Sequence, residues 1–324
     1  MRNEAHNITK TLPKILNQSS QNIQFIFIND KSTDNTQEVL EQITKKHQDK
    51  DIIIIQGTPL PKGWVGKQWA LHQAQQYATG DILLFVDADV LLHKDAMRSL
   101  LQEFNETESD MLSVFPKQVM KTWGEKIATP LQSWALLTFY PLVLATSKLF
   151  PQLAVANGQV IMISKEAYQQ VGGHEAVKGS MVEDIALAEK VKQERLNLNL
   201  CFGAEMISCR MYQSLNSAWA GYSKNYFTAT KLPKAVFLIV IPLLYFFHII
   251  SFLGWIVYYP LITLLAARVI KRVALSRLTG ENSFLAVLLH PLQITFFVFV
   301  GINSFFQTNF GKVSWKGRKY GSGK

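Results

Sequence analysis

Cysteine is scarce in this chain, which contains only Cys201 and Cys209 among 324 residues. Two cysteines without a further partner at metal-binding spacing predict neither a disulfide framework nor a zinc site, and they favour a reducing compartment. Acidic residues are also fewer than basic ones, 24 against 33, so the formal net charge is +9. The opening residues, Met1 to Glu4, are polar and do not predict a signal peptide.

A basic stripe interleaved with aromatic residues, which nucleic-acid-binding proteins carry, is missing as well. The basic residues of the C-terminal part instead flank apolar runs. They are Lys231, Lys234, Arg268, Lys271, Arg272, Arg277, Lys312, Lys316, Arg318 and Lys319. This pattern is typical of cytoplasmic membrane flanks that contact anionic lipids. The sequence therefore predicts a membrane protein with no nucleic-acid partner.

Two long apolar runs are present beyond residue 231. Residues 235–267 are nearly uncharged and exceed the roughly 20 residues that one membrane helix needs. They form either one tilted span with an interfacial extension or a helix pair broken near Gly254 or Pro260. Residues 283–306 predict a second span.

The membrane region leaves two questions open. His248 and His290 lie within the apolar runs and are either functional intramembrane groups or hydrogen-bonded structural ones. A simple two-span count places residues 268–277 outside the cell. A paired first run with a re-entrant second run keeps every basic cluster in the cytosol.

The first 230 residues read as an α/β protein. A helix is expected over residues 4–16, a strand over 23–28, a helix ending near residue 47 and a strand over 51–55. Strand, helix and strand in this order predict a parallel sheet with right-handed crossovers. No strand precedes the first helix.

The central strand is expected over residues 82–86 and leads into Asp87 and Asp89. Side chains alternate along a strand, so these carboxylates would share one face about 7 Å apart. Ligands collect beyond the carboxyl ends of buried parallel strands. Two hard oxygen ligands at this spacing suit Mg²⁺ or Mn²⁺ carrying phosphates.

Three further stretches have more than one interpretation. Lys67 follows a Gly/Pro loop and opens a helix, where it either holds phosphate or is a solvated surface lysine. The aromatic-rich segment 123–153, broken by prolines, is either a set of amphipathic helices on the membrane that line an acceptor site or core packing. Glu183 and Asp184 open an apolar helix, where the helix dipole alone explains two acids.

Taken together, these motifs resemble glycosyltransferase family 2, the inverting enzymes whose GT-A fold binds a nucleotide sugar. The ordered set is Arg2-Asn3-Glu4, Asn29 to Asp34, Asp87-Ala88-Asp89 and Glu183-Asp184. The resemblance covers about residues 2–230, and the loop from Pro59 to Ala70 is similar to the hopanoid- and carotenoid-associated branch. Leu289 to Leu292 and Val313 to Tyr320 resemble the C-terminal region of glycosyltransferases acting on diapocarotenoid acids such as 4,4'-diaponeurosporenoate.

The resemblance implies a role for each motif residue. Glu4 and Asp30 would hold the uracil and ribose, and Asp87 the ribose or diphosphate. Asp89 would bind Mg²⁺ or Mn²⁺, which neutralises charge on the departing UDP. Lys67 would approach the diphosphate or base. Asp184 would serve as general base, because inversion by direct displacement needs a base opposite the leaving group.

Two departures from the family pattern are visible. The Gln/Arg-x-x-Arg-Trp motif of many members is absent, which argues against a processive polysaccharide synthase. Glu183, Arg210, Trp219 and Lys224 are instead the expected acceptor or diphosphate contacts. The family also places a buried strand before the segment matching Arg2 to Glu4, so we expect an upstream start codon or a true truncation. The missing strand would lie between the strands ending at Asn29 and Asp87.

The resemblance thus implies a membrane-bound hexosyltransferase with a GT-A catalytic domain (residues 1–230), a membrane region (231–311) and a basic cytoplasmic tail (312–324). We expect it to move glucose from UDP-glucose, with inversion, onto a polyisoprenoid lipid such as a diapocarotenoid carboxylic acid at the cytoplasmic face of the cell membrane. Alternatives are a hydroxyl-bearing acceptor (hopanoid, diacylglycerol or ceramide-like) and a non-catalytic membrane scaffold. The oligomeric state does not follow from the sequence.

Overall fold

The chain divides into two compact units in the computed structural model, which describes residues 1–203, 205–256, 258–311, 313–315 and 318–320. The first unit comprises residues 1–117 and 140–209, and the second comprises 118–139 and 210–324. The units do not divide near residue 230, because α5 (Trp123–Ala128) and α6 (Pro130–Phe139) pack with C-terminal helices. The extent of the catalytic domain stays a prediction. Lys312, Lys316, Gly317 and residues 321–324 of the expected tail lie outside the described residues.

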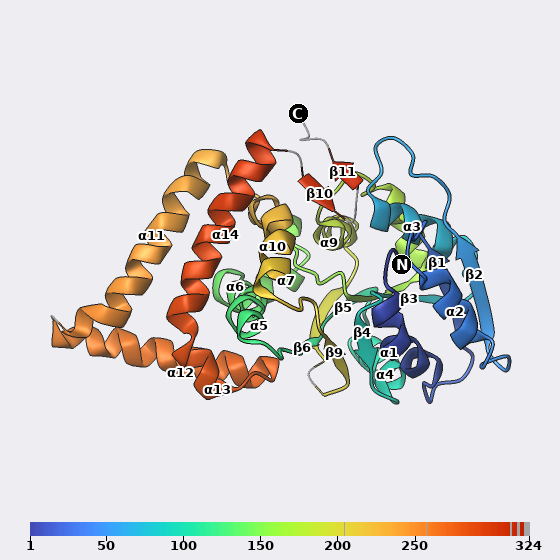
Figure 1. Cartoon of the computed structure of the whole chain (residues 1–324), viewed down its shortest axis with the longest axis horizontal. Helices are drawn as coiled ribbons and strands as arrows, with labels where there is room; N and C mark the ends of the chain where they lie inside the picture. Colours follow the sequence, from blue (N-terminus) through green and yellow to red (C-terminus); the bar gives the residue numbers. More distant parts are fainter. Residues whose placement is uncertain (204, 257, 312, 316–317, 321–324) are drawn as a thin grey trace. The chain divides into compact units, whose positions relative to one another are not determined.

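A four-stranded mixed sheet forms the centre of the first unit (Figure 1). Its order is β3 (Ile82–Val86), β7 (Val160–Ser164), β5 (Met111–Phe115) and β8 (Leu198–Phe202). β7 runs antiparallel to both β3 and β5, whereas β5 and β8 are parallel. The expectation of a mostly parallel sheet is therefore wrong here. Continuous apolar runs show only that both faces of a strand are covered, and they do not reveal the direction of its neighbour.

A parallel pair, β1 (Gln24–Asn29) and β2 (Asp51–Gln56), confirms the first two expected strands. Within the described residues this pair shares no backbone ladder with β3. The expectation that a further strand lies between them stays a prediction. The short strands β4 (Val90–Leu92) and β9 (Ile207–Cys209) pair antiparallel, and β6 (Lys117–Gln118) lies where the chain leaves this unit.

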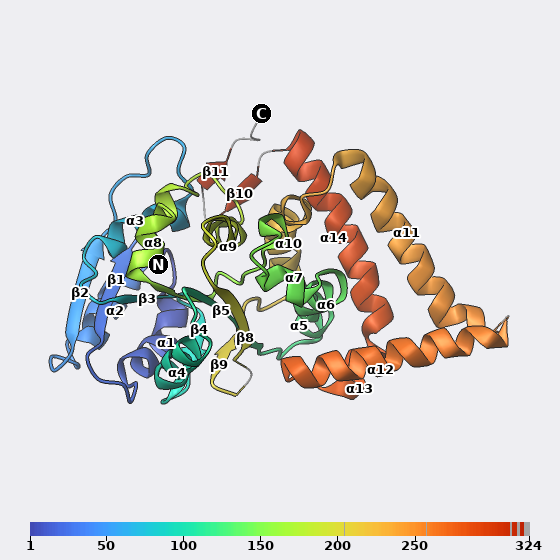
Figure 2. The same cartoon turned by 180° about the vertical axis from the view of Figure 1, so that it is seen from behind.

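Helices pack around the strands of the first unit, and loops connect them to the strand ends (Figures 1 and 2). They are α1 (Ala5–Leu16), α2 (Thr36–Thr44), α3 (Gly66–Gln75), α4 (Ala96–Glu106), α7 (Leu142–Thr146), α8 (Lys165–Gln170) and α9 (Glu183–Gln193), with short 3₁₀ turns η1 (Pro151–Leu153) and η2 (Gly173–Glu175). The core packs α9 residues Leu187 and Val191 with Met111, Ile163 and Leu198 of the sheet. This packing fixes the N-terminus of α9 relative to the sheet.

The second unit is helical apart from the antiparallel pair β10 (Val313–Trp315) and β11 (Arg318–Tyr320). Besides α5 and α6 it contains α10 (Leu215–Thr230), α11 (Lys234–Leu253), α12 (Ile262–Thr279), α13 (Ser283–Leu288) and α14 (His290–Phe310), with 3₁₀ turns η3 (Gly254–Ile256) and η4 (Tyr259–Leu261). α10 and α11 pack on α14, and α12 leads from the end of α11 back to α13 and the start of α14 (Figures 1 and 2). Trp134, Phe237, Ile294 and Phe297 are central to its core.

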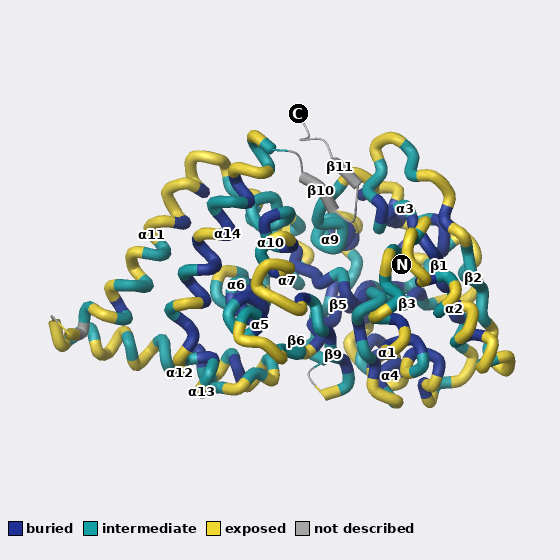
Figure 3. Tube along the Cα trace, viewed as in Figure 1, coloured by how far each residue is buried: buried dark blue, intermediate teal, exposed yellow. Residues whose placement is uncertain are grey.

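Helix α11 is the one helix in the described ranges with the length and apolar composition to cross a membrane. It has 20 residues, and only 17% of its 18-residue apolar stretch is buried. Figure 3 shows most of α11 exposed. The first apolar run breaks after Leu253, close to the expected break at Gly254. The second expected span is divided at Leu289 and is largely buried in its unit, so it is not confirmed.

Candidate active site

Asp87 and Asp89 lie in the turn that joins β3 to β4. The Val90 N–H donates to the Asp87 carbonyl (3.1 Å), and the Asp87 N–H donates to the Gln159 carbonyl beside β7 (2.9 Å). The strand itself ends at Val86. The expected strand-face arrangement of the two acids is therefore wrong, because the hydrogen bond across residues 87–90 turns the backbone before Asp89.

Lys67 enters the same site from the first turn of α3. Its ammonium lies 2.8 Å from Asp87 Oδ1 and 3.0 Å from Glu183 Oε1, and it donates to the Gly158 carbonyl at 2.9 Å. Burial lowers the pKa of Lys67, but the charges of Asp87 and Glu183 outweigh that effect and raise it. Lys67 is thus a fully charged cation that joins two acids, which excludes the alternative of a solvated surface lysine.

The two carboxylates that Lys67 contacts have pKa values shifted in opposite directions. Burial raises the pKa of Asp87, and Lys67 offsets only part of that increase. Burial acts in the same direction on Glu183, yet there the Lys67 charge prevails and the pKa is lowered. Glu183 and Glu4 add negative charge around Asp87, which acts in the same direction as its burial and raises its pKa.

Asp184 is held by backbone donors on both of its oxygens. The Gly158 N–H donates to Oδ2 (2.8 Å), and the Ile185 N–H donates to Oδ1 (2.9 Å). Burial and the charge of neighbouring Glu183 raise the pKa of Asp184 to about 6. The two acids at the start of α9 therefore do more than complement a helix dipole, because each contacts a group distant in sequence.

This raised pKa makes the stability of an Asp184→Asn variant depend on pH. An acid whose pKa rises on folding binds more protons in the folded chain, so the wild-type fold loses stability as the pH rises from about 4 to about 6. Asn cannot ionise, so the free energy of unfolding of the variant relative to wild type should rise by about 2 kcal/mol between pH 4.5 and 7.5.

Thermal unfolding of metal-free protein at the two pH values measures this change, about 5 °C in Tm. Exposed Asp51→Asn, which removes one carboxylate outside this cluster, provides the control. A constant difference between Asp184→Asn and wild type at both pH values would contradict the expectation.

Asp89 faces the same cluster from the turn. The Cys209 thiol hydrogen-bonds to it, and burial together with the charges of Asp87 and Glu4 raises the pKa of Asp89 to about 6. The Gln159 amide in turn donates to the Cys209 sulfur at 2.9 Å. Asp89 is thus an acid in negatively charged surroundings, which a bound cation would relieve.

The donor set at Asp87 and Asp89 fits a divalent cation held mainly by its substrate. No group of three or more His, Cys, Asp or Glu side chains within the described ranges is arranged to enclose a metal ion. Mg²⁺ and Mn²⁺ are commonly bound by one or two carboxylates together with phosphate oxygens. Two carboxylates in one turn meet that requirement, while a zinc-type cage is not built by these residues.

Glu4 and Asp30 lie in the same unit. Glu4 precedes α1, accepts a hydrogen bond from the Asn7 amide (2.7 Å), and adds negative charge beside Asp87 and Asp89. Asp30 is buried at the carboxyl end of β1, and its carbonyl accepts from Arg2 (3.0 Å). The structure therefore brings Glu4, Lys67, Asp87, Asp89, Glu183 and Asp184 together, while the nucleotide contacts assigned to Glu4 and Asp30 stay predictions.

Arg210, Trp219 and Lys224 belong to the second unit. Arg210 forms a two-point ion pair with Glu125, at 2.7 and 3.3 Å, and Trp219 packs edge-on against Phe296 with ring centroids 5.8 Å apart. These contacts give Arg210 and Trp219 structural roles. Their expected contacts with acceptor or diphosphate stay predictions, as does that of Lys224.

Gly158, Gln159 and Cys209 take part in the site but were not among the expected residues. Gly158 bonds Lys67 through its carbonyl and Asp184 through its N–H. The only signal for them in the sequence is the position of Asn157-Gly158-Gln159 directly before the residues of β7. Nothing in the sequence indicates that Cys209, at the end of β9, would meet Asp89.

A Gly158→Ala substitution tests how closely this glycine is packed. An added Cβ would lie 3.2 Å from both Asp184 Oδ2 and Lys67 Nζ, so both groups would have to move by a few tenths of an ångström. We expect kcat/KM for sugar transfer to fall about 10-fold, since small misplacements of reacting groups are costly. Gly80→Ala, whose Cβ would meet only the Ile82 carbonyl at 3.9 Å, should be neutral. Equal activities of the two variants would contradict this role of Gly158.

Comparisons with known proteins identify the family and the fold of the chain. Residues 1–172 match the family described as Glycosyl transferase family 2. The chain is 29% identical over 336 aligned positions to the 4,4'-diaponeurosporenoate glycosyltransferase of Staphylococcus aureus strain USA300, covering 100% of this chain and 87% of that protein. The protein of the same name from strain MRSA252 is also 29% identical.

One solved structure supports the fold. The mannosyltransferase of Pyrobaculum calidifontis in complex with GDP-Man and Mn²⁺ superposes with a TM-score of 0.50 at 18% identity, covering 68% of this chain. The matched region spans 61% of that protein's chain. The mixed sheet of the first unit, with its helices, is thus a GT-A fold.

Proposed function

Because the chain belongs to glycosyltransferase family 2, we propose that it transfers glucose from UDP-glucose, with inversion, to the carboxylate of a polyisoprenoid acid such as 4,4'-diaponeurosporenoate. The relatives that carry this acceptor in their name support the acceptor class, since the similarity extends over the whole chain. The observation that carries the proposal is the convergence of Lys67, Asp87, Asp89 and Asp184 beside the end of β3. Transferase activity itself follows from the family.

In the proposed reaction, a carboxylate oxygen of the acceptor bonds to the anomeric carbon of glucose. The bond from that carbon to the diphosphate breaks, and UDP leaves with the electron pair. Asp87 and Asp89 would hold a divalent cation, which would neutralise charge on the leaving diphosphate. Lys67 holds the Asp87 and Glu183 carboxylates in place through its two ion pairs.

A carboxylic acid acceptor needs no proton removed at neutral pH, because carboxyl pKa values lie near 4. Asp184 is then not required as a base. A hydroxyl-bearing lipid is the second candidate acceptor, and the raised pKa of Asp184, about 6, favours it. A general base is most effective when its pKa lies near the working pH.

Membrane attachment is part of the proposal. Exposed α11 supports it, since an acceptor that stays in the bilayer requires an enzyme at the bilayer surface. We place the catalytic unit on the cytoplasmic side, where nucleotide sugars are made and where free Cys201 and Cys209 stay reduced.

Release of UDP from UDP-glucose by membranes carrying the full chain tests this function. We expect release to depend on an added diapocarotenoid acid and the glucosyl ester to appear in equal amount. A hopanoid alcohol and diacylglycerol, supplied separately, test the second candidate. Release with none of these acceptors, although the membranes bind UDP-glucose, would overturn both acceptor assignments. Absence of UDP-glucose binding would overturn the donor assignment.

A further inference from the structure

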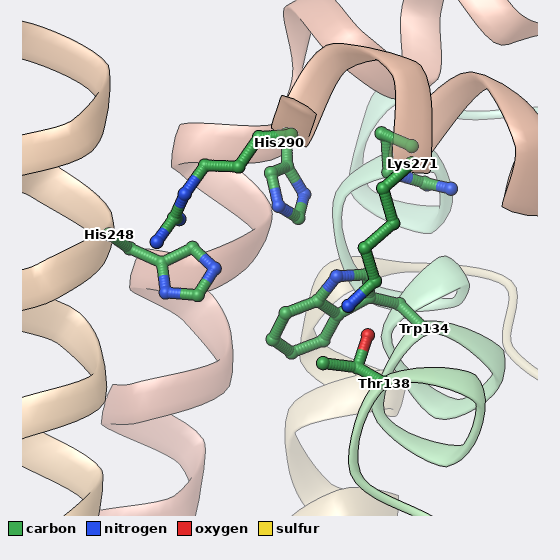
Figure 4. A pocket seen from close by; sticks show the side chains of 7 residues that line it. Trp134, Thr138, His248, Lys271 and His290 are labelled. Atoms are coloured by element: carbon green, nitrogen blue, oxygen red, sulfur yellow. The ribbon is translucent and has the colours of Figure 1, made fainter. Parts of the chain in front are cut away.

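A cavity of about 220 Å³ lies within the second unit. Trp134 and Thr138 of α6 line it together with His248 of α11, His290 of α14 and three basic residues of α12. Figure 4 shows the side chains of Trp134, Thr138, His248, Lys271 and His290 turned toward one another around it. The cavity shares no residue with the candidate active site.

The three basic residues of α12 give this cavity a strong positive charge. Arg268, Lys271 and Arg272 all line it. The second unit contains only two acids, Glu125 and Glu281. Glu125 is paired with Arg210, and Glu281 is paired with Arg272 at 2.6 Å. No acid of this unit is left to neutralise Arg268 and Lys271.

Hydrogen-bond donors around the cavity also lack partners. Arg272 is 2% exposed, and within the described residues its Nε, the Nη1 of Arg268 and the Oγ1 of Thr138 are buried without a hydrogen bond. Leaving a buried charged donor unsatisfied costs free energy, and such groups are rare in folded proteins. Unpaired cations and unsatisfied N–H donors at one cavity indicate an anion with several acceptor oxygens.

One wall of the cavity is formed by aromatic rings in contact. Trp134 packs edge-on against His248 and His290 with ring centroids 5.6 and 5.5 Å apart, and the two histidine rings lie 5.8 Å apart. The two histidines that the sequence singled out thus meet at one cavity, although they are 42 positions apart (290 minus 248). A wall of aromatic rings on one side and arginine and lysine side chains on the other suit a compact oxygen-rich group.

A phosphate group matches these features, and its surroundings point to a lipid as its source. Arginine binds phosphate through paired N–H donors. Phe246, Phe247 and Ile250, which flank His248 on apolar α11, are 58%, 55% and 36% exposed. A phospholipid could place its headgroup in the cavity and its acyl chains along that helix, and basic pockets between membrane helices bind anionic headgroups in this way.

We propose that this cavity binds the phosphodiester headgroup of an anionic phospholipid, which attaches the second unit to an anionic membrane. The proposal concerns lipid binding alone and is independent of the sugar and acceptor assigned above. It also gives α12 a function, since its basic residues lie on an otherwise apolar segment.

The test uses the full chain in detergent, titrated with dioctanoyl phosphatidylglycerol while Trp fluorescence reports binding. Arg268→Gln with Lys271→Gln removes the two unpaired cations and should weaken binding at least about 10-fold, as expected for charged hydrogen bonds. Arg277→Gln is the matched control, because Arg277 lies on the same helix, is exposed and does not line the cavity. Its affinity should stay within about twofold of wild type. Exposed Lys271→Gln alone serves if the double variant does not fold, and should weaken binding about threefold.

Equal losses in Arg277→Gln and in the cavity variants would show general surface attraction and overturn the proposal, as would unchanged binding by the cavity variants. Dioctanoylglycerol lacks phosphate and should not bind to the cavity. Equal affinity of wild type and of the cavity variants for dioctanoylglycerol would show that Arg268 and Lys271 have no role in binding it. Inorganic phosphate and glycerol 3-phosphate distinguish the source of the group. If either bound as tightly as the lipid, the lipid assignment would be wrong.

Discussion

Replacing Asp89 by Asn should reduce acceptor-dependent UDP release about 10³-fold, a loss of several kcal/mol of the kind that metal-assisted charge stabilisation supplies. The side chain keeps its size, but it loses the negative charge that would hold a cation beside Asp87. Asp89 also lies in acidic surroundings, so the variant should fold at least as stably as wild type in the absence of metal. The measurement is steady-state UDP release over a range of Mn²⁺ and Mg²⁺ concentrations.

Two controls isolate the cause of that loss. Exposed Asp51→Asn removes one acid from the same unit and should keep wild-type activity. A chelator should reduce wild-type activity to the level of Asp89→Asn, while having little further effect on the variant. Full activity of Asp89→Asn at ordinary metal concentrations, or chelator-resistant activity of the wild type, would contradict a role for Asp89 in holding the cation.

The Asp184→Asn variant should distinguish the two classes of acceptor. With a hydroxyl acceptor, loss of the general base should lower kcat by about 10² to 10⁴-fold. With a carboxylate acceptor the nucleophile is already ionised, so the loss should stay below about 10-fold. The expected result for this chain is the smaller loss with a diapocarotenoid acid and the larger one with any hydroxyl lipid that it accepts.

A pH profile supports the same distinction. Activity toward a hydroxyl acceptor should fall as the pH drops below about 6, because Asp184 becomes protonated and cannot accept a proton. Saturating Mn²⁺ keeps Asp89 ionised, so activity toward a carboxylate acceptor should persist below pH 6 until the acceptor itself is protonated. A loss of 10²-fold or more for Asp184→Asn with the carboxylate acceptor would contradict the expectation that this reaction needs no base.

Much of the first unit could be predicted because its signals are local. The buried positions Ile8, Leu12, Ile15 and Leu16 recur at helical spacing and become one face of α1. The uninterrupted apolar stretch at residues 82–86 becomes β3. The direction of β7 could not be predicted, because pairing between distant strands leaves no mark on either strand alone.

The site could be predicted only in part, because some of its contacts leave no signal in the sequence. Asp87, Asp89 and the acids of α9 stand out by residue type, and ordered motifs brought them together before any geometry was known. Gly158 contributes only backbone groups, and Cys209 acts through a tertiary contact, so their residue types carried little information. The cavity of the second unit is lined by residues of four helices, α6, α11, α12 and α14, and no single stretch of sequence indicates it.

The peptide groups flanking Gly158 have a consequence for how the two substrates depend on each other. Gly158 accepts a hydrogen bond from Lys67 on its carbonyl and donates its N–H to Asp184, so the two side chains are joined through the backbone atoms O, C, Cα and N of one residue. A donor that drew Lys67 toward its diphosphate would shift this backbone and re-aim Asp184 at the acceptor. Energetic coupling of this kind is reciprocal, so the acceptor would adjust the affinity for the donor by the same factor. The affinities for donor and acceptor would then depend on each other, and Gly158→Ala would weaken that dependence.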